Sequence, residues 1–263
     1  MKKIFYIMLS VACFAATAQA QTVVTINAAD NTTTEHHIEY TTTELHHKEL
    51  GELISTLPTT VTVTAEDSDV ITIAAPAGIF PYLKFYIRED SLAIAYDNDA
   101  PQKVKSTLSQ TCHIEVTIPS QSLRHIYNTS DMNLKFESGK CAKKLNIINT
   151  LTMAIISTDI TAESNIEINN TGTMTMKVDN LNTKQLFTMN AGYLYMHGAT
   201  TATTITHAST GIDNTSLTVD CQTLEITSNG EGIIEYQGVA DNITVANMGK
   251  AKIKTSELNN FEE

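Results

Sequence analysis

Acidic side chains are the residues of this sequence with the clearest potential for chemistry. Two carboxylates roughly 5 to 9.5 Å apart cleave glycosidic bonds in many enzymes. The candidates are Asp159, Asp179, Asp213 and Glu231. They occupy different places in the repeat described below, and the only arginines, Arg88 and Arg124, do not lie beside an acidic ladder. The short corners of the repeat also leave no walls for a cleft. We therefore predict no catalytic residues and no enzyme.

Two histidine pairs, His36–His37 and His46–His47, could ligate a metal ion. Adjacent histidines on a strand point to opposite faces, and no cysteine or carboxylate cluster completes a site beside them. A polar surface is the simpler interpretation. The sequence predicts no metal site and no cofactor.

Tyr193 and Tyr195 are the candidates for ligand binding. They alternate with Leu194 and Met196, which places the two rings on the outer face of a strand. We expect Ile212 and Ile233 near them on later repeats. An exposed aromatic and aliphatic patch could bind a sugar or a partner protein. Tyrosine is also frequent in strands for packing reasons alone, so a purely structural role is the alternative.

The elements that would position these side chains belong to a sequence repeat with a period of about 20 residues. Triplets of the form Asn/Ser-x-Gly begin at Asn170, Asn190, Ser209, Ser228 and Asn247. The corresponding coils start at Leu123, Leu145, Ile166, Leu186, Ile205, Leu224 and Ile243, with steps of 22, 21, 20, 19, 19 and 19 residues. Apolar and polar residues alternate on both sides of each glycine, which indicates short strands. Short strands at this period indicate a solenoid.

The period also selects the kind of solenoid. Helical repeats need more than about 30 residues, and the leucine-rich pattern is absent. We predict an all-β, single-stranded parallel β-helix, with seven coils spanning on the order of 35 Å. Glycine is expected at each corner for a positive φ or for a close approach of backbones. Asparagine and serine can bond within the turn or from coil to coil. The triplet is thus an architectural feature.

The first third of the chain has a different sequence pattern. Short strand patterns over residues 61–96 and 113–119 predict the first, wider coils. Residues 21–57 precede them, with a stretch at 44–57 that could hold a short helix. The end of a solenoid exposes unpaired backbone groups of its edge strands and needs a capping segment. We expect an N-terminal cap over residues 21–57 and the β-helix domain over residues 58–260.

Residues 1–20 have the pattern of a secretory signal peptide. Lys2 and Lys3 precede an apolar run, and small residues end it at Ala20, where we predict cleavage. The alternative is a lipid anchor at Cys13, which the flanking residues disfavour. No other apolar run approaches the roughly 18 residues of a membrane-spanning helix. Export to the periplasm, the outer-membrane surface or the medium is expected.

Three cysteines follow the signal: Cys112, Cys141 and Cys221. An odd number in an exported chain argues against a disulfide framework. The repeat places Cys141 and Cys221 four coils apart, roughly 19 Å along the axis, whereas a disulfide needs Cα atoms within about 7 Å. We predict buried free thiols and no bridge between residues 141 and 221.

A family resemblance adds to this interpretation. The run “VTVTAEDSDVITIAAPAGIFPYLKFYIREDSLAIAY”, then “HIEVTIPSQSLRHI” and the Leu-x-Ile-x-x-x-Gly coils, resembles the DUF2807 family. That family is labelled putative auto-transporter adhesin, head GIN domain, and is common in secreted proteins of Bacteroidetes. The resemblance covers about residues 50–258 and implies a right-handed parallel β-helix. It carries over no catalytic or binding residues. The Gly-Ile-Asn-like triplet of the family is replaced around “LPTTVTV”, and its Ser-Gly-Ala-Ser corners are here Asn/Ser-x-Gly.

These observations predict a non-enzymatic, exported cell-envelope or surface protein, an adhesin-like solenoid with a binding or structural role. The alternatives are a periplasmic or surface glycan-binding accessory protein, a polysaccharide-acting β-helix enzyme, or an envelope scaffold without an external ligand. The formal net charge of −12 disfavours nucleic acid and anionic lipid as partners. An unidentified protein or glycan is the expected ligand, and the sequence leaves the oligomeric state open.

Overall fold

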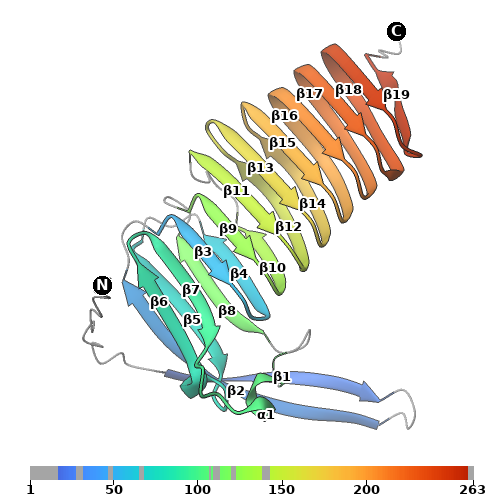
Figure 1. Cartoon of the computed structure of the whole chain (residues 1–263). Coiled ribbons are helices and arrows are strands. Elements are labelled where there is room, and N and C mark those ends of the chain that lie inside the picture. The colour runs from blue at the N-terminus through green and yellow to red at the C-terminus, as the bar shows by residue number, and fades with distance from the viewer. Residues whose placement is uncertain are drawn as a thin grey trace, which may run out of the picture.

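The described part of the chain is nearly all β, and its strands form a parallel β-solenoid of about six turns (Figure 1). The computed structural model describes residues 17–27, 32–46, 50–64, 68–106, 108, 113–119, 123–137 and 143–259, with side chains from residue 39 onward. The predicted all-β, parallel β-helix fold is confirmed.

Each turn contributes a strand to two sides of the solenoid. The first side stacks β9 (His125–Asn128), β11 (Lys144–Asn149), β13 (Asn165–Asn170), β15 (Gln185–Asn190) and the second halves of β16 (Tyr193–Ser209), β17 (Ile212–Ser228) and β18 (Glu231–Asn247). The second side stacks β10 (Asp131–Phe136), β12 (Thr152–Thr161), β14 (Thr173–Asn182), the first halves of β16, β17 and β18, and β19 (Lys252–Leu258). Every one of these pairings is parallel.

The pairing register confirms the repeat. The predicted coil starts share one inward column: Leu145, Ile166, Leu186, Ile205, Leu224 and Ile243. Leu123 was placed one residue out of register. His125 pairs with Asn146, so Arg124 stands opposite Leu145 and the first step is 21 residues, not 22. Leu123 is buried just before β9. Because it is apolar, the sequence pattern could not distinguish it from a residue of the inward column.

The core is formed by these inward columns, because each strand buries every second residue. The last turn is covered on one side only. β19 pairs with residues 233–238 of β18, and no described strand lies beyond residues 242–247. Ile243 is therefore 41% exposed although it continues the column of Ile205, which is 1% exposed.

This difference gives a matched pair of substitutions. We expect Ile205→Ala to lower the free energy of unfolding by about 2 to 4 kcal/mol, because it leaves a cavity in a closed core. Ile243→Ala should lower it by less than about 1 kcal/mol, because much of that side chain already contacts water. Denaturant unfolding of both variants measures the difference. Equal losses would contradict the open end of the first side.

The N-terminal part combines parallel and antiparallel pairing. β3 (Glu52–Ser55) lies in parallel between β7 (Ser91–Tyr96) and β9, and β4 (Thr59–Thr64) lies in parallel between β8 (Ile114–Pro119) and β10. β6 (Leu83–Arg88) pairs with β7 in antiparallel fashion. Among the described residues of this part are also two short helices, η1 (Phe80–Tyr82) and α1 (Gln102–Lys105).

A long hairpin of β1 (Thr17–Asn27) and β2 (Thr32–His46) lies at this end, and β2 continues onto β5 (Val70–Pro76) (Figure 1). The short helix allowed for residues 44–57 is wrong, since none of the described residues there is helical: residues 44–46 lie in β2 and residues 52–55 form β3. Residues 1–16 lie outside the described residues, Cys13 among them. Cleavage after Ala20 would fall within β1 and stays a prediction. No helix in the described part of the chain is long and apolar enough to span a membrane.

Candidate ligand-binding face

An asparagine ladder runs inside the corner between the two sides of the solenoid. The amide nitrogens of Asn128, Asn149 and Asn170 each donate to the amide oxygen one turn on, at 2.8, 2.8 and 2.9 Å. Asn190 continues the ladder to the hydroxyl of Ser209 at 3.3 Å. All of these side chains are buried. The predicted bonding from coil to coil is confirmed.

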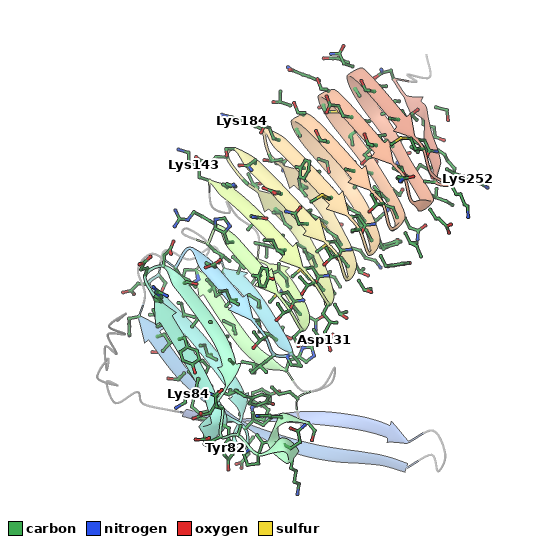
Figure 2. The ribbon with its side chains drawn as sticks, in the orientation of Figure 1. Tyr82, Lys84, Asp131, Lys143, Lys184 and Lys252 are labelled. Carbon is green, nitrogen blue, oxygen red and sulfur yellow. The ribbon has the colours of Figure 1, made fainter. Side chains whose placement is uncertain are left out.

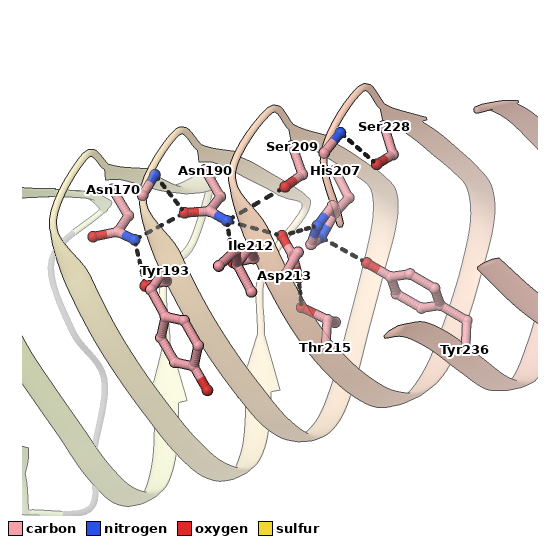
Figure 3. A network of polar contacts seen from close by, with 12 residues as sticks. Asn170, Asn190, Tyr193, His207, Ser209, Ile212, Asp213, Thr215, Ser228 and Tyr236 are labelled. Carbon is pink, nitrogen blue, oxygen red and sulfur yellow. Dashed lines mark hydrogen bonds and ion pairs between the residues drawn. The ribbon is translucent and has the colours of Figure 1, made fainter. Parts of the chain in front are cut away.

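The ladder also fixes the start of the second side. Asn170 Nδ2 donates to the carbonyl oxygen of Tyr193 at 2.9 Å, and Asn190 Nδ2 donates to that of Ile212 at 2.9 Å (Figure 3). The buried amides thus hold the backbones of residues whose own side chains point outward. Buried, satisfied networks of this kind rigidify the segment they bind.

The corner glycines serve a close backbone approach. A Cβ atom added to Gly192, Gly211 or Gly230 would lie 2.0 Å from the carbonyl oxygen of the glycine in the preceding turn. None of these three glycines has a positive φ. Of the two reasons expected for glycine here, the close approach is the one that applies.

Tyr193 and Tyr195 lie on the outer surface of the second side. Tyr193 is 39% exposed and stands beside Ile212, which is 46% exposed, in the next turn. Tyr195 is half-buried. Asn214 separates it from Ile233, which is 43% exposed. We call the outward positions of residues 152–157, 173–178, 193–198, 212–217, 231–236 and 250–255 the tyrosine face.

The sequence reasoning missed several exposed apolar residues, two of which lie next to the predicted tyrosines. Phe187 and Met189 point outward from the first side, immediately before the corner that leads to Tyr193. The sequence did contain a signal for them, because Phe187 and Met189 alternate with the inward residues Leu186 and Thr188. One turn therefore presents apolar side chains on both sides of its corner.

The acidic candidates do not form one cluster, because Asp159 and Asp179 lie on the neighbouring strands β12 and β14 whereas Asp213 and Glu231 lie further along the solenoid. Asp159 accepts a hydrogen bond from Asn180 at 3.0 Å, and Asp179 is exposed at a register shift of β14. Glu231 forms an ion pair with Lys250. Asp213 is fully buried. Because Asp213 is buried and Glu231 is paired, these two carboxylates do not form a hydrolytic pair.

Asp213 instead belongs to a buried polar cluster that the sequence did not predict (Figure 3). Its carboxylate lies 3.0 Å from Nε2 of His207 and accepts from the hydroxyl of Thr215 at 2.7 Å and from Asn190 Nδ2 at 3.3 Å. The hydroxyl of Tyr236 lies 2.9 Å from Nδ1 of His207. Because the carboxylate can only accept, Nε2 donates to it, and in the neutral ring Nδ1 accepts from Tyr236.

The surroundings of the cluster shift the pKa values of Asp213 and Tyr236. Burial alone would raise the pKa of Asp213, but hydrogen bonds from His207 and Thr215, with the attraction of His207, outweigh it and lower the pKa. Burial and the nearby carboxylate raise the pKa of Tyr236 well above its ordinary value. The cluster is closed to solvent, so its role is structural support.

The described residues contain no cluster that could bind a metal ion and no exposed thiol. No group of three metal-binding side chains gathers there. His46 lies 3.8 Å from Asp69, whereas the side chains of His36, His37 and His47 lie outside the described set. Cys221 is buried and free, as predicted, and burial raises its pKa to about 11. Cys112 and Cys141 lie outside the described residues.

The fold recurs in solved structures described as putative adhesins. One from Bacteroides fragilis NCTC 9343 is 14% identical with a TM-score of 0.57, over 82% of this chain and 96% of its own. One from Parabacteroides distasonis ATCC 8503 is 14% identical with a TM-score of 0.53, over 82% and 97%. One from Parabacteroides merdae ATCC 43184 is 15% identical with a TM-score of 0.50, over 82% and 96%. Identities this low show a shared fold alone.

The sequence itself gives the closer assignment. No curated protein matches the chain. The family described as “Putative auto-transporter adhesin, head GIN domain”, DUF2807, matches over residues 49–262, which is most of the length. The chain therefore belongs to the DUF2807 family.

Proposed function

We propose that the protein is a non-enzymatic, exported, adhesin-like surface protein that binds a protein or glycan ligand through the tyrosine face. The observation that carries this proposal is an apolar strip, led by Tyr193 and Ile212, whose backbone is fixed by the buried asparagine ladder. A surface that is already ordered loses little conformational entropy on binding. The adhesin description of the family supports the same role.

The acidic residues support the non-enzymatic part of the proposal. A hydrolase of this fold would need two carboxylates at one place on the surface. Here Asp213 is buried, Glu231 is paired with Lys250, and Asp159 accepts a hydrogen bond from Asn180. The proposal therefore assigns binding, and no catalytic step, to this surface.

The double substitution Tyr193→Ala with Tyr195→Ala tests the face. We expect it to weaken ligand binding by more than about tenfold, because exposed aromatic anchors dominate binding surfaces. The ligand is found by screening the purified protein on glycan and matrix-protein arrays, and affinities are then measured by calorimetry. The control is Tyr86→Ala, which removes a tyrosine that is 54% exposed on β6, far along the chain from the face. Equal binding by both variants would remove the tyrosine face from the proposal.

A further inference from the structure

The tyrosine face carries positive charge on an acidic molecule. Its outward positions hold two glutamates, Glu231 and Glu235, and four lysines: Lys177, Lys250, Lys252 and Lys254. The whole chain has a formal net charge of −12. The face therefore differs in sign from the molecule that bears it.

Two of the four lysines lack a carboxylate partner. Lys250 pairs with Glu231 at 3.2 Å and Lys254 pairs with Glu235 at 3.1 Å, so both glutamates are compensated. Lys177 and Lys252 are exposed, and no described carboxylate lies within ion-pair distance of either. These two ammonium groups are free to meet an anion.

The free lysines flank the apolar strip. Tyr195, Asn214, Ile233 and Lys252 follow one another in a single outward column. At the other end, the Lys177 ammonium lies 5.7 Å from the centre of the Tyr195 ring. Four strand spacings, or about 19 Å, separate the turns of Lys177 and Lys252. A ligand that contacts both must be extended.

We propose that the tyrosine face binds an acidic polysaccharide, with sugar rings against Tyr193 and Tyr195 and anionic groups at Lys177 and Lys252. This inference rests on the proposed function and names its ligand class. The C–H faces of sugar rings suit the negative faces of aromatic rings. A lysine is a compact point charge that suits single carboxylate or sulfate groups. The outward side chains of Thr175, Asn214 and Ser216 add hydrogen-bonding groups for hydroxyls.

The overall negative charge does not prevent this binding. At physiological ionic strength, exposed charges farther apart than about 8 Å are largely screened from one another. The lysines on the face therefore decide the local attraction, whereas carboxylates on other faces contribute little. The affinity should fall as salt is added, because the contacts at Lys177 and Lys252 are exposed.

The test compares acidic and neutral polymers on the full protein. The probes are polygalacturonate and chondroitin sulfate, with neutral dextran and poly-L-glutamate as comparisons. We expect at least one acidic glycan to bind and dextran not to bind. Lys177→Gln with Lys252→Gln should weaken this binding by about tenfold or more. The matched control, Lys143→Gln with Lys184→Gln, removes the same charge from exposed lysines that Figure 2 places along a different edge and should change affinity less than about twofold.

Several outcomes would overturn the inference. Unchanged binding by the Lys177 and Lys252 variant would exclude a role of these lysines in binding. Equal binding of dextran would show that charge does not select the ligand. Binding of poly-L-glutamate as tight as that of the glycans would mean that an acidic protein fits equally well. If neither acidic glycan binds while another ligand is lost on changing Tyr193 and Tyr195, the proposed function stands and the acidic-polysaccharide inference fails.

Discussion

Replacing Gly211 by alanine is expected to lower the free energy of unfolding by more than about 3 kcal/mol, beyond the usual range for an added methyl group. The new Cβ would lie 2.0 Å from the carbonyl oxygen of Gly192, closer than real Cβ atoms approach any heavy atom. The obstacle is backbone, so no side chain can rotate away. That carbonyl also accepts a hydrogen bond from the backbone N–H of Ile212 at 2.8 Å, and moving the turns apart would break this bond.

The effect should concentrate around the substituted turn. In a solenoid each turn contacts only its neighbours, so stability is a sum of local terms. Denaturant unfolding followed by circular dichroism measures the loss. Gly78→Ala is the control, because a Cβ there meets nothing within 4 Å, and we expect a change within about 0.5 kcal/mol. If Gly211→Ala proved as stable as Gly78→Ala, the close stacking of the corners would be wrong.

The same packing explains why the repeat could be predicted from the sequence. Only glycine fits at Gly192, Gly211 and Gly230, and the inward column must be apolar in every turn, so both requirements recur at the period of the fold. The N-terminal part follows no such period. There β2 pairs with β5 and β3 pairs with β7, contacts between distant segments that no local pattern records. The helix allowed for residues 44–57 failed for that reason.

The candidate face was predictable in part. Alternation alone placed Tyr193 and Tyr195 outward, and the 19-residue step placed Ile212 beside Tyr193. The buried cluster was not predictable, because His207 and Asp213 stand in different inward columns and Tyr236 comes from the next turn. Each broke the apolar pattern on its own. Only the folded structure shows that these three side chains form hydrogen bonds with one another.

Asp213→Asn is expected to lower the free energy of unfolding by about 3 kcal/mol at pH 7, because buried donors that bond to an ionised group lose their acceptor. The carboxylate accepts from His207, Thr215 and Asn190, so both of its oxygens are used. An amide has only one oxygen, and its NH2 group would face donors in a site without water access. Buried donors that lose their acceptor are costly.

The loss should depend on pH in a direction fixed by the carboxyl group. The pKa of Asp213 is lowered in the folded protein below its ordinary value of 3.8. Its contribution is therefore fully present above the unfolded value and is lost as the pH falls through the folded one. The stability gap between the native protein and Asp213→Asn should shrink as the pH falls below 3.8. Other carboxylates titrate in both proteins, so the difference reports Asp213 together with His207, the titratable side chain it contacts.

Two further variants separate the buried charge from general effects. Asp220→Asn removes an exposed carboxylate from the same strand, β17, and should change stability by less than about 0.5 kcal/mol. Tyr236→Phe removes only the hydroxyl that bonds to His207, and should lose about 1 to 2 kcal/mol without the acid dependence. A gap for Asp213→Asn that stayed constant down to pH 3 would mean that the carboxylate is not held ionised. Because Asn190 bonds both to this carboxylate and to the backbone of Ile212, losing the charge should also loosen the backbone of the tyrosine face.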